Sequence, residues 1–486
     1  MSSRSVPHGG LRLDGHKSRP LEQPVLAVPP PRTCILALDQ GSGEEAEAIV
    51  EPGTRVRVGT RVAAGRGTAA DLHAPVSGTV TGATRLPTAA GEGRCLVIES
   101  DGRDEREPGV APLDWQALDG PSLIERLAAS GLAGLGGAAF PTASKLAMAR
   151  AAAVELLVLN GAECEPWICC DDALMRERAA EVVVGARVML AASGAAHGVI
   201  AVEDDKPEAC AALEAALVVT GDARLELRVL PALFPLGAEG LLIAALTGRE
   251  VPHDGLPPDV GVVCQNVGTA AAAARFVTEG LPAVTRIVTV TGGGVRRPAN
   301  VEARLGTPVV ELIAACGGYR TTPDRLIAGG ALTGRTLASD DVPVTKGLNC
   351  VLAATAADLP ARGPEMPCIR CGDCADVCPV QLLPQQLHRA ARADDVAALA
   401  RHGLAACIEC GCCDYVCPSA IPLTARFRAA RERQRLLGAE RRRTEEARAR
   451  FERHRERLAA QAEEERRAFE DARRRARGDG PPPGTG

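Results

Sequence analysis

The sequence predicts a multidomain protein that combines α/β and α+β parts. With 486 residues, the chain is longer than one hydrophobic core usually serves, and its 46% of apolar residues can fill several cores. The pattern changes along the chain, from short alternating strands to mixed helices and apolar strands, and then to a cysteine-rich segment and a charged helical end. We expect five parts, with boundaries at 1–110, 111–284, 285–358, 359–424 and 425–486.

The composition excludes several classes of protein. The net charge is −5, but residues 426–477 hold 19 arginines against 11 acidic residues, so the rest of the chain carries −13 and is a poor partner for nucleic acid. Met1–Asp14 lacks the apolar core of a signal peptide, and the apolar stretch Glu181–Val202 is too polar to span a bilayer. Eighteen cysteines without an export signal indicate a reducing compartment, where cysteines bind metals or fill cores.

The first part is expected to be a β hybrid barrel. Residues 45–100 alternate valine with polar residues around Pro-Gly and Ser-Gly turns. The stretch His73–Val80, HAPVSGTV, resembles the hairpin of biotinyl and lipoyl carrier domains. Those carriers need a lysine to acylate, and none occurs between Lys17 and Lys145. We therefore expect a barrel-sandwich-hybrid-like domain with a structural role.

The central parts alternate helices with strands. Residues 121–280 show helical patterns at 122–130 and 141–151, an apolar strand that ends at Asn160, and a helix from Asp172 to Ala192, which is α/β organisation. Residues 285–345 return to strands with one helix, a β-grasp-like pattern.

The end of the chain, from Ala425 to Arg477, is expected to be one helix that is polar nearly all round, followed by a disordered end. Such a helix is either solvated and held by Glu–Arg pairs or docked onto anionic lipid or an acidic partner.

A cysteine pattern occurs twice between residues 368 and 417. Each copy reads Cys-x2-Cys-x2-Cys-x3-Cys-Pro, the run that holds [4Fe–4S] clusters in bacterial ferredoxins, where the fourth cysteine ligates the other cluster. This predicts one cluster on Cys368, Cys371, Cys374 and Cys417, and a second on Cys407, Cys410, Cys413 and Cys378. Two zinc sites are the alternative, but structural zinc sites use paired cysteines without the third step or the Cys-Pro ending.

Two loops of the α/β part are candidates for binding a nucleotide. Gly134, Gly136 and Gly137 would let a ligand approach the backbone, and the following helix start and Lys145 would attract an anion. A strand ends in Asn160–Pro166, which carries Glu163 and Glu165, and these carboxylates suit hydrogen bonds to ribose or nicotinamide. A tight turn between helices and an ordinary acidic loop are the alternatives.

These motifs, in this order, resemble a known family. The two loops resemble the flavin-binding core of the flavoprotein subunit of respiratory complex I. The whole order resembles the RnfC family of Rnf electron-transport complexes more closely, over about residues 8–425. The stretches that carry the resemblance are HGGLRLDGHK (8–17), HAPVSGTV (73–80), GLGGAAFPTASKL (134–146), NGAECEP (160–166), a β-grasp segment (291–318), PVTKG (343–347) and both cysteine runs.

The resemblance implies roles for individual residues. Residues that would line or approach the FMN are Gly134, Gly136, Gly137, Lys145, Asn160, Asn266 and Thr269. Glu163 and Glu165 would act at the face where FMN meets nicotinamide. The chain departs from the pattern at Ala139, which adds a methyl group, at Ala162, and at Gly240, which replaces a lysine.

The resemblance also implies a function. The chain would be a peripheral subunit at the cytoplasmic face of the inner membrane, passing electrons between NADH, FMN and two [4Fe–4S] clusters. Its partners would be other subunits of an ion-translocating complex and ferredoxin or a ferredoxin-like subunit. The alternatives are a soluble cobalamin reductase of bacterial microcompartments, which shares the domain order, and a ferredoxin module whose flavin site has decayed.

Overall fold

The computed structural model describes residues 8–108 and 111–478, and the chain divides into two compact bodies. The first body contains the residues up to Gln385 together with Ala406–Thr424. The second contains Gln386–Ala405 and the residues from Ala425 onward. Both cysteine runs therefore belong to the first body, with the α/β part.

The N-terminal part is built from short antiparallel strands, as the alternating sequence predicts. Four strands pair in the order β2-β8-β7-β4, and three more in the order β3-β5-β6. Their bounds are Thr33–Ala37 (β2), Glu47–Ala48 (β3), Arg55–Val56 (β4), Arg61–Ala64 (β5), Leu72–His73 (β6), Gly78–Thr88 (β7) and Gly91–Ser100 (β8). The HAPVSGTV stretch runs from β6 into β7, and its buried valines face the core of this part.

The α/β part holds a parallel sheet with the strand order β11-β10-β9-β12. The strands are Leu156–Gly161 (β9), His197–Glu203 (β10), Leu225–Leu230 (β11) and Val262–Asn266 (β12). The side chains of β9, β10 and β12 are buried almost without interruption, as expected for parallel strands covered on both faces. In this register Asn160 lies beside Asn266, so the polar ends of β9 and β12 meet at one edge.

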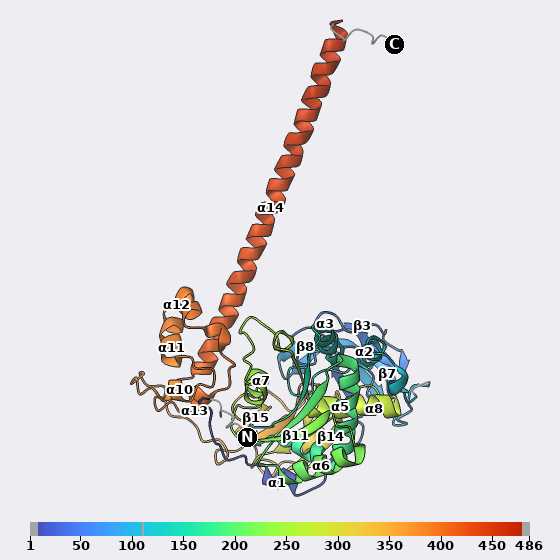
Figure 1. Ribbon diagram of the computed structural model, residues 1–486, viewed down its shortest axis with the longest axis vertical. Coiled ribbons are helices and arrows are strands. Elements are labelled where there is room, and N and C mark those ends of the chain that lie inside the picture. The colour runs from blue at the N-terminus through green and yellow to red at the C-terminus, as the bar shows by residue number, and fades with distance from the viewer. Residues whose placement is uncertain (1–7, 109–110, 479–486) are drawn as a thin grey trace. The chain divides into compact units, whose positions relative to one another are not determined.

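Seven helices surround this sheet among the described residues, and Figure 1 shows α5 lying against it. They are Gly120–Ala129 (α2), Thr142–Ala151 (α3), Cys170–Glu177 (α4), Ala179–Ser193 (α5), Pro207–Thr220 (α6), Glu239–Thr247 (α7) and Val267–Glu279 (α8). The prediction of one helix over Asp172–Ala192 is wrong, because the helix breaks at Arg178, where φ is −132°. Neither glycine nor proline marks this break. Instead, the turn aims the Arg178 guanidinium at Glu302 of the neighbouring sheet.

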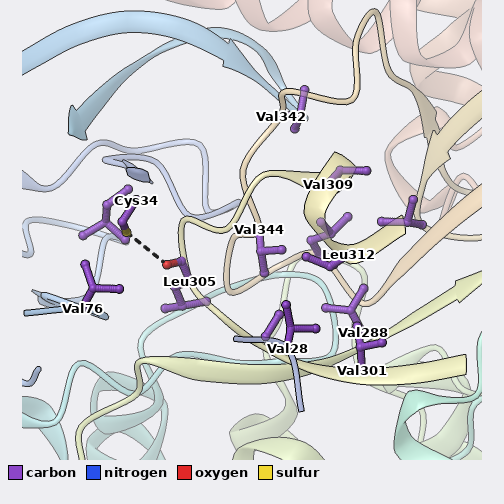
Figure 2. Close-up of a cluster of buried hydrophobic side chains, with 14 of the residues drawn as sticks. Val28, Cys34, Val76, Val288, Val301, Leu305, Val309, Leu312, Val342 and Val344 are labelled. Atoms are coloured by element: carbon purple, nitrogen blue, oxygen red, sulfur yellow. Dashed lines mark hydrogen bonds between the residues drawn. The ribbon is translucent and has the colours of Figure 1, made fainter. Parts of the chain in front are cut away.

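The β-grasp part forms a mixed sheet with the order β1-β14-β13-β17-β15-β16. The elements are Leu26–Ala27 (β1), Thr285–Thr291 (β13), Ala299–Arg304 (β14), Val309–Ala315 (α9), Arg325–Ala328 (β15), Arg335–Thr336 (β16) and Cys350–Ala354 (β17). Its core is continuous with that of the N-terminal part. Figure 2 shows Cys34 and Val76 facing Leu305 and its neighbours, and the Cys34 thiol donates to the Leu305 carbonyl at 3.4 Å.

The cysteine-rich segment consists mostly of loops. Two one-turn helices, Asp373–Asp376 (α10) and Cys412–Tyr415 (α13), stand at equivalent places in the two cysteine runs and pack against each other. Between the runs the chain forms Pro384–Arg392 (α11) and Val396–Arg401 (α12).

The last element, α14 (Leu423–Ala476), is a single helix of 54 residues, in agreement with the prediction for 425–477. Exposed pairs such as Arg448–Glu452 at 3.0 Å and Arg466–Glu463 at 2.8 Å run along it. Each such pair adds little to stability, because solvent screens its charges. The predicted disorder at 479–486 lies outside the described residues. Within 8–108 and 111–478, no helix offers an apolar stretch that could cross a bilayer.

Candidate functional site

A cleft of about 240 Å³ opens at the carboxyl ends of β9 and β12, where parallel sheets commonly bind ligands. Of the residues predicted to bind or act on a cofactor in the α/β part, five line it: Gly136, Asn160, Glu163, Glu165 and Asn266. The wall also contains Phe234, Pro235 and Asn349, and two residues of the second cysteine run, Ile408 and Cys410. Gly134, Gly137, Lys145 and Thr269 are not among the lining residues.

The glycine loop is a closed turn with an open outer side. The Gly134 N–H donates to the Phe140 carbonyl at 2.9 Å, and the Ala139 N–H donates back to the Gly134 carbonyl at 3.1 Å. Gly137 has φ +115°, and a Cβ there would meet no atom within 4 Å, so its backbone is free to lie against a flat ligand. The methyl group of Ala139 is buried, 3.5 Å from where a Cβ on Gly41 would stand, so it faces the N-terminal part.

The start of α8 fixes this loop in place. The Asn266 side-chain oxygen caps the helix by accepting from Gly268 N at 2.8 Å and Thr269 N at 3.3 Å. The buried Thr269 hydroxyl accepts from Leu135 N at 2.9 Å, which joins the helix start to the glycine loop. Thr269 therefore shapes the cleft from behind. Asn160 similarly donates to the Gly237 carbonyl at 2.8 Å and so joins the end of β9 to the segment before α7, which also lines the cleft.

Glu163, which is buried, and Asp171, which is half-buried, form a pair of neighbouring carboxyl groups in the cleft. Burial and, to a smaller extent, the charge of Asp171 raise the pKa of Glu163 to about 7, against the opposing effect of Lys17. Burial likewise raises the pKa of Asp171, whose side chain accepts from Asn266 Nδ2 at 2.6 Å. The Glu163 carboxylate in turn accepts from Asp171 N at 2.9 Å. The pair can therefore hold a proton near neutral pH.

Glu165 and Lys145 have other partners. The Glu165 carboxylate accepts from the backbone N–H groups of Leu332 at 2.9 Å and Thr333 at 2.8 Å, so it anchors a β-grasp loop to the rim of the cleft. The Lys145 ammonium pairs with Glu239 at the start of α7. The positive charge of Lys145 is thus offset by a carboxylate.

The eight predicted cluster ligands fall into two groups. Burial raises the pKa of Cys374, and the charges of Cys371, Cys368 and Cys417 raise it further, so these four thiols are neighbours. In the other group, burial raises the pKa of Cys413, with further contributions from Asp414, Cys410 and Cys407. Cys378 belongs with this second group, because the charge of Cys410 adds to the effect of burial on its pKa.

The surroundings of the two groups differ. Cys368 and Cys371 are exposed, whereas Cys410 lies in the wall of the cleft. A hydrogen bond from Cys412 is the main reason that the pKa of Cys410 falls to about 7, which favours the thiolate needed for metal binding. Cys412 itself is fully buried and supports its neighbour. Four thiols in each group are the donor set that a [4Fe–4S] cluster requires.

A larger cleft, of about 290 Å³, lies between α5, α8 and the strands β13 and β14. Several of its charged residues are paired with one another, for example Arg275 with Glu302 at 2.6 Å. It is lined by none of the residues predicted to bind or act on a cofactor and by no cluster cysteine. The smaller cleft is therefore the candidate site.

Sequence comparison identifies four families along the chain. The matched models are the RnfC barrel sandwich hybrid domain (residues 6–103), the Nuo51 FMN-binding domain (127–275), the SLBB domain (287–336) and the 4Fe-4S dicluster domain (367–421). They confirm the predicted fold class, and they confirm FMN and [4Fe–4S] binding as properties of the families to which these segments belong. The boundaries between the five parts stay predictions.

Curated relatives cover nearly the whole chain. It is 47% identical to RnfC, a subunit of the ion-translocating oxidoreductase complex, from Pseudomonas aeruginosa, over 97% of this chain and 61% of the relative. The proteins of the same name from Cronobacter sakazakii and Yersinia enterocolitica are each 42% identical, over 93% of this chain and 58% and 65% of their own lengths. The chain thus spans about three fifths of the length of these relatives. Among solved structures, an NAD+-reducing [NiFe]-hydrogenase matches 49% of the chain and 49% of its own length, at 22% identity and a TM-score of 0.42.

Proposed function

We propose that the chain is a member of the RnfC family of ion-translocating oxidoreductase complexes, to which its curated relatives belong, and that it passes electrons between NADH and a protein partner through FMN and two [4Fe–4S] clusters. The relatives named above favour this function over a cobalamin reductase of bacterial microcompartments. In a ferredoxin module whose flavin site has decayed, the second cysteine run would not need to share a wall with the nucleotide cleft. That shared wall, in which Cys410 and Ile408 line the same cleft as Gly136 and Asn160, is the observation that carries the proposal.

The cleft residues suit an FMN in several ways. Gly137 leaves open space beside its backbone, and Gly136 lines the cleft, so an aromatic ring system could lie against the loop. Phe234 and Ile168 supply apolar walls, as ring systems require. When bound, FMN supplies the conversion between a two-electron donor and one-electron carriers. We assign its direct contacts to Gly136, Asn160 and Asn266, which line the cleft. Of the other residues predicted to bind FMN, Gly134 and Gly137 belong to the same glycine loop, Thr269 holds that loop from behind, and Lys145 follows it with its charge paired to Glu239.

Glu163 and Asp171 would bind and release a proton at this site. Reduction of a bound flavin by a hydride would also involve a proton, and the Glu163 carboxyl group, with a pKa of about 7, could give or take one at neutral pH. The oxygens of Glu163 are held by Asp171 N at 2.9 Å and Asp172 N at 3.2 Å, which fixes where that proton is carried. Glu165 would act more remotely, by holding the β-grasp loop at the rim.

The exposure of the cysteines suggests the order in which electrons pass through the two clusters. Cys410 borders the cleft, so the group of Cys407, Cys410, Cys413 and Cys378 would exchange electrons with the flavin. Cys368 and Cys371 are exposed, so the other group would face the partner. We propose that this partner is ferredoxin or another subunit of the complex, that electron flow drives ion translocation in that complex, and that the chain works as a peripheral subunit at the cytoplasmic face of the membrane.

The test is anaerobic reduction of the purified protein by NADH. Flavin absorbance and the electron paramagnetic resonance (EPR) signal of reduced clusters are followed in the same sample. The proposal predicts that both respond to NADH and that removing the flavin abolishes the cluster signal. A protein that retains clusters but binds no flavin, or whose clusters ignore NADH while its flavin is reduced, would contradict it.

A further inference from the structure

The segment 8–17 precedes the first strand of the barrel and crosses from the cysteine-rich part to the flavin cleft. At its first end the Gly10 N–H donates to the Val377 carbonyl at 3.0 Å, one residue before Cys378. Gly9 packs so closely there that a Cβ would stand 2.8 Å from the Val377 carbonyl carbon and 2.9 Å from that of Cys378. Its φ of +71° also belongs to the region that favours glycine. Only glycine allows this contact without displacement.

The middle of the segment pairs with the wall of the cleft. Leu11 and Phe234 exchange two backbone hydrogen bonds, of 2.7 and 2.9 Å, in an isolated antiparallel bridge. Gly10 again leaves no room for a side chain, because its Cβ would lie 2.8 Å from the Phe234 carbonyl oxygen. Phe234 and Pro235 both line the cleft. The segment therefore touches the loop of a cluster cysteine and the flavin wall within three residues.

The far end is fixed beside the acidic loop. The Gly15 carbonyl accepts from Trp167 N at 2.7 Å, and the His16 ring stacks on the Trp167 ring at 4.4 Å with planes 10° apart. Trp167 has φ +74°, an unfavourable conformation for a bulky residue that its surroundings must stabilise. The Lys17 ammonium donates to the Glu163 carbonyl. This end thus fixes the chain on both sides of Glu165.

We propose that residues 8–17 form a positioning strap that holds the loop of Cys378, and with it the second cluster, against the wall of the flavin cleft. The strap contributes no ligand, and its residues are positioning residues. The inference rests on the proposed function, because it concerns electron transfer from the reduced flavin to the second cluster. In this step the flavin loses one electron and the oxidised cluster gains it. Loosening the strap slows this step and leaves the reaction between NADH and flavin unchanged.

The decisive variant is Gly9→Ala, measured by anaerobic stopped flow after mixing with NADH. Flavin bleaching should keep its wild-type rate, and cluster reduction should slow several-fold, because the rate of electron transfer falls steeply as the distance between flavin and cluster grows. Gly53→Ala is the matched control, since Gly53 also has a positive φ, +89°, but a Cβ there meets nothing within 4 Å. It should match the wild type in both phases.

A second readout does not depend on turnover. Hydrogen exchange of the peptide covering 8–17 should be slow in the wild type and faster in Gly9→Ala, because the Gly10 and Leu11 amides lose their carbonyl partners. If Gly9→Ala fails to retain its iron, His16→Ala replaces it. This variant removes the stacking at the other end and leaves the Cys378 loop untouched, and it should also slow only cluster reduction.

The outcomes separate two failures. If iron-replete Gly9→Ala, or His16→Ala in its place, reduces its clusters as fast as Gly53→Ala, the strap has no role in electron transfer and the inference is wrong. The inference is also wrong if both phases slow equally, since that indicates a disturbed fold. If wild-type clusters are never reduced through the flavin, the proposed function itself fails.

Discussion

The most quantitative prediction concerns Lys346, a lysine buried to 1% exposure where the first three parts meet. Its ammonium donates to the backbone carbonyls of Asp71 at 2.9 Å, in the N-terminal part, and Gly131 at 2.6 Å, after α2. Burial lowers its pKa from 10.5 to about 7, against the opposing effect of the Asp71 charge. The change to be tested is Lys346→Met, which keeps the length of the side chain and removes the titrating group.

The sign of the effect follows from the two pKa values. Between pH 7 and 10.5 the unfolded chain binds a proton that the folded chain has released, so the folded state becomes more stable as pH rises. One proton corresponds to about 1.4 kcal/mol per pH unit. From pH 7.5 to 9.5, the free energy of unfolding of the wild type should therefore rise by about 3 kcal/mol relative to that of the variant.

The assay is urea unfolding followed by tryptophan fluorescence at several pH values, with wild type and variant compared at each. Lys17→Met controls for the loss of a lysine as such, because Lys17 is only partly buried and also donates to a carbonyl. If the difference in free energy of unfolding between wild type and Lys346→Met stays constant from pH 7.5 to 9.5, the reasoning is wrong. Lys346 would then bind its proton in the folded core as it does in the unfolded chain.

Three further changes test the site and the fold. Lys145→Ala should lower the flavin content at unchanged iron content, measured on the purified protein, because it removes the positive charge beside the glycine loop; full flavin in the variant would contradict its assignment. Cys417→Ser should alter the same EPR signal as Cys368→Ser, since the fourth cysteine of each run ligates the other cluster. A Cys417→Ser spectrum that matches variants of the second run's own first three cysteines would show uncrossed ligands. Gly185→Ala should destabilise the protein by about 1–3 kcal/mol in thermal unfolding, because its Cβ would meet a carbonyl of α8 at 1.8 Å, whereas Gly240→Ala should cost nothing, having open space.

The sequence predicts the succession of parts well because each part has its own local pattern. Alternating valines, apolar parallel strands and the cysteine spacing are all set by residues close together in the chain. The break at Arg178 could not be predicted, since it depends on Glu302, more than a hundred residues away. The direction of the Ala139 methyl group likewise depends on Gly41 in another part.

The candidate site is predictable only in part, for the same reason. Asn160 and Asn266 follow strand ends, and the register of the sheet brings them together. No sequence motif marks Asp171 as a site residue. Its role depends on its contact with Glu163, whose carboxylate accepts from Asp171 N. The placement of Cys410 in the cleft wall depends on how the cysteine-rich segment folds back, which spacing alone does not determine. In the sequence, residues 8–17 stand out only because they resemble the RnfC family. The proposal that they form a positioning strap depends on their contacts with Val377, Phe234 and Trp167.

The central claim is that electrons pass between the flavin cleft and the second cysteine group before they reach the first. The direct measurement compares Cys368→Ser, which disrupts the first cluster, with Cys407→Ser, which disrupts the second, after anaerobic mixing with NADH. Flavin should be reduced in both. The account predicts that the cluster remaining in Cys368→Ser is then reduced at the wild-type rate, while the cluster remaining in Cys407→Ser stays oxidised on that time scale. Rapid cluster reduction in Cys407→Ser, with slow reduction in Cys368→Ser, would contradict it.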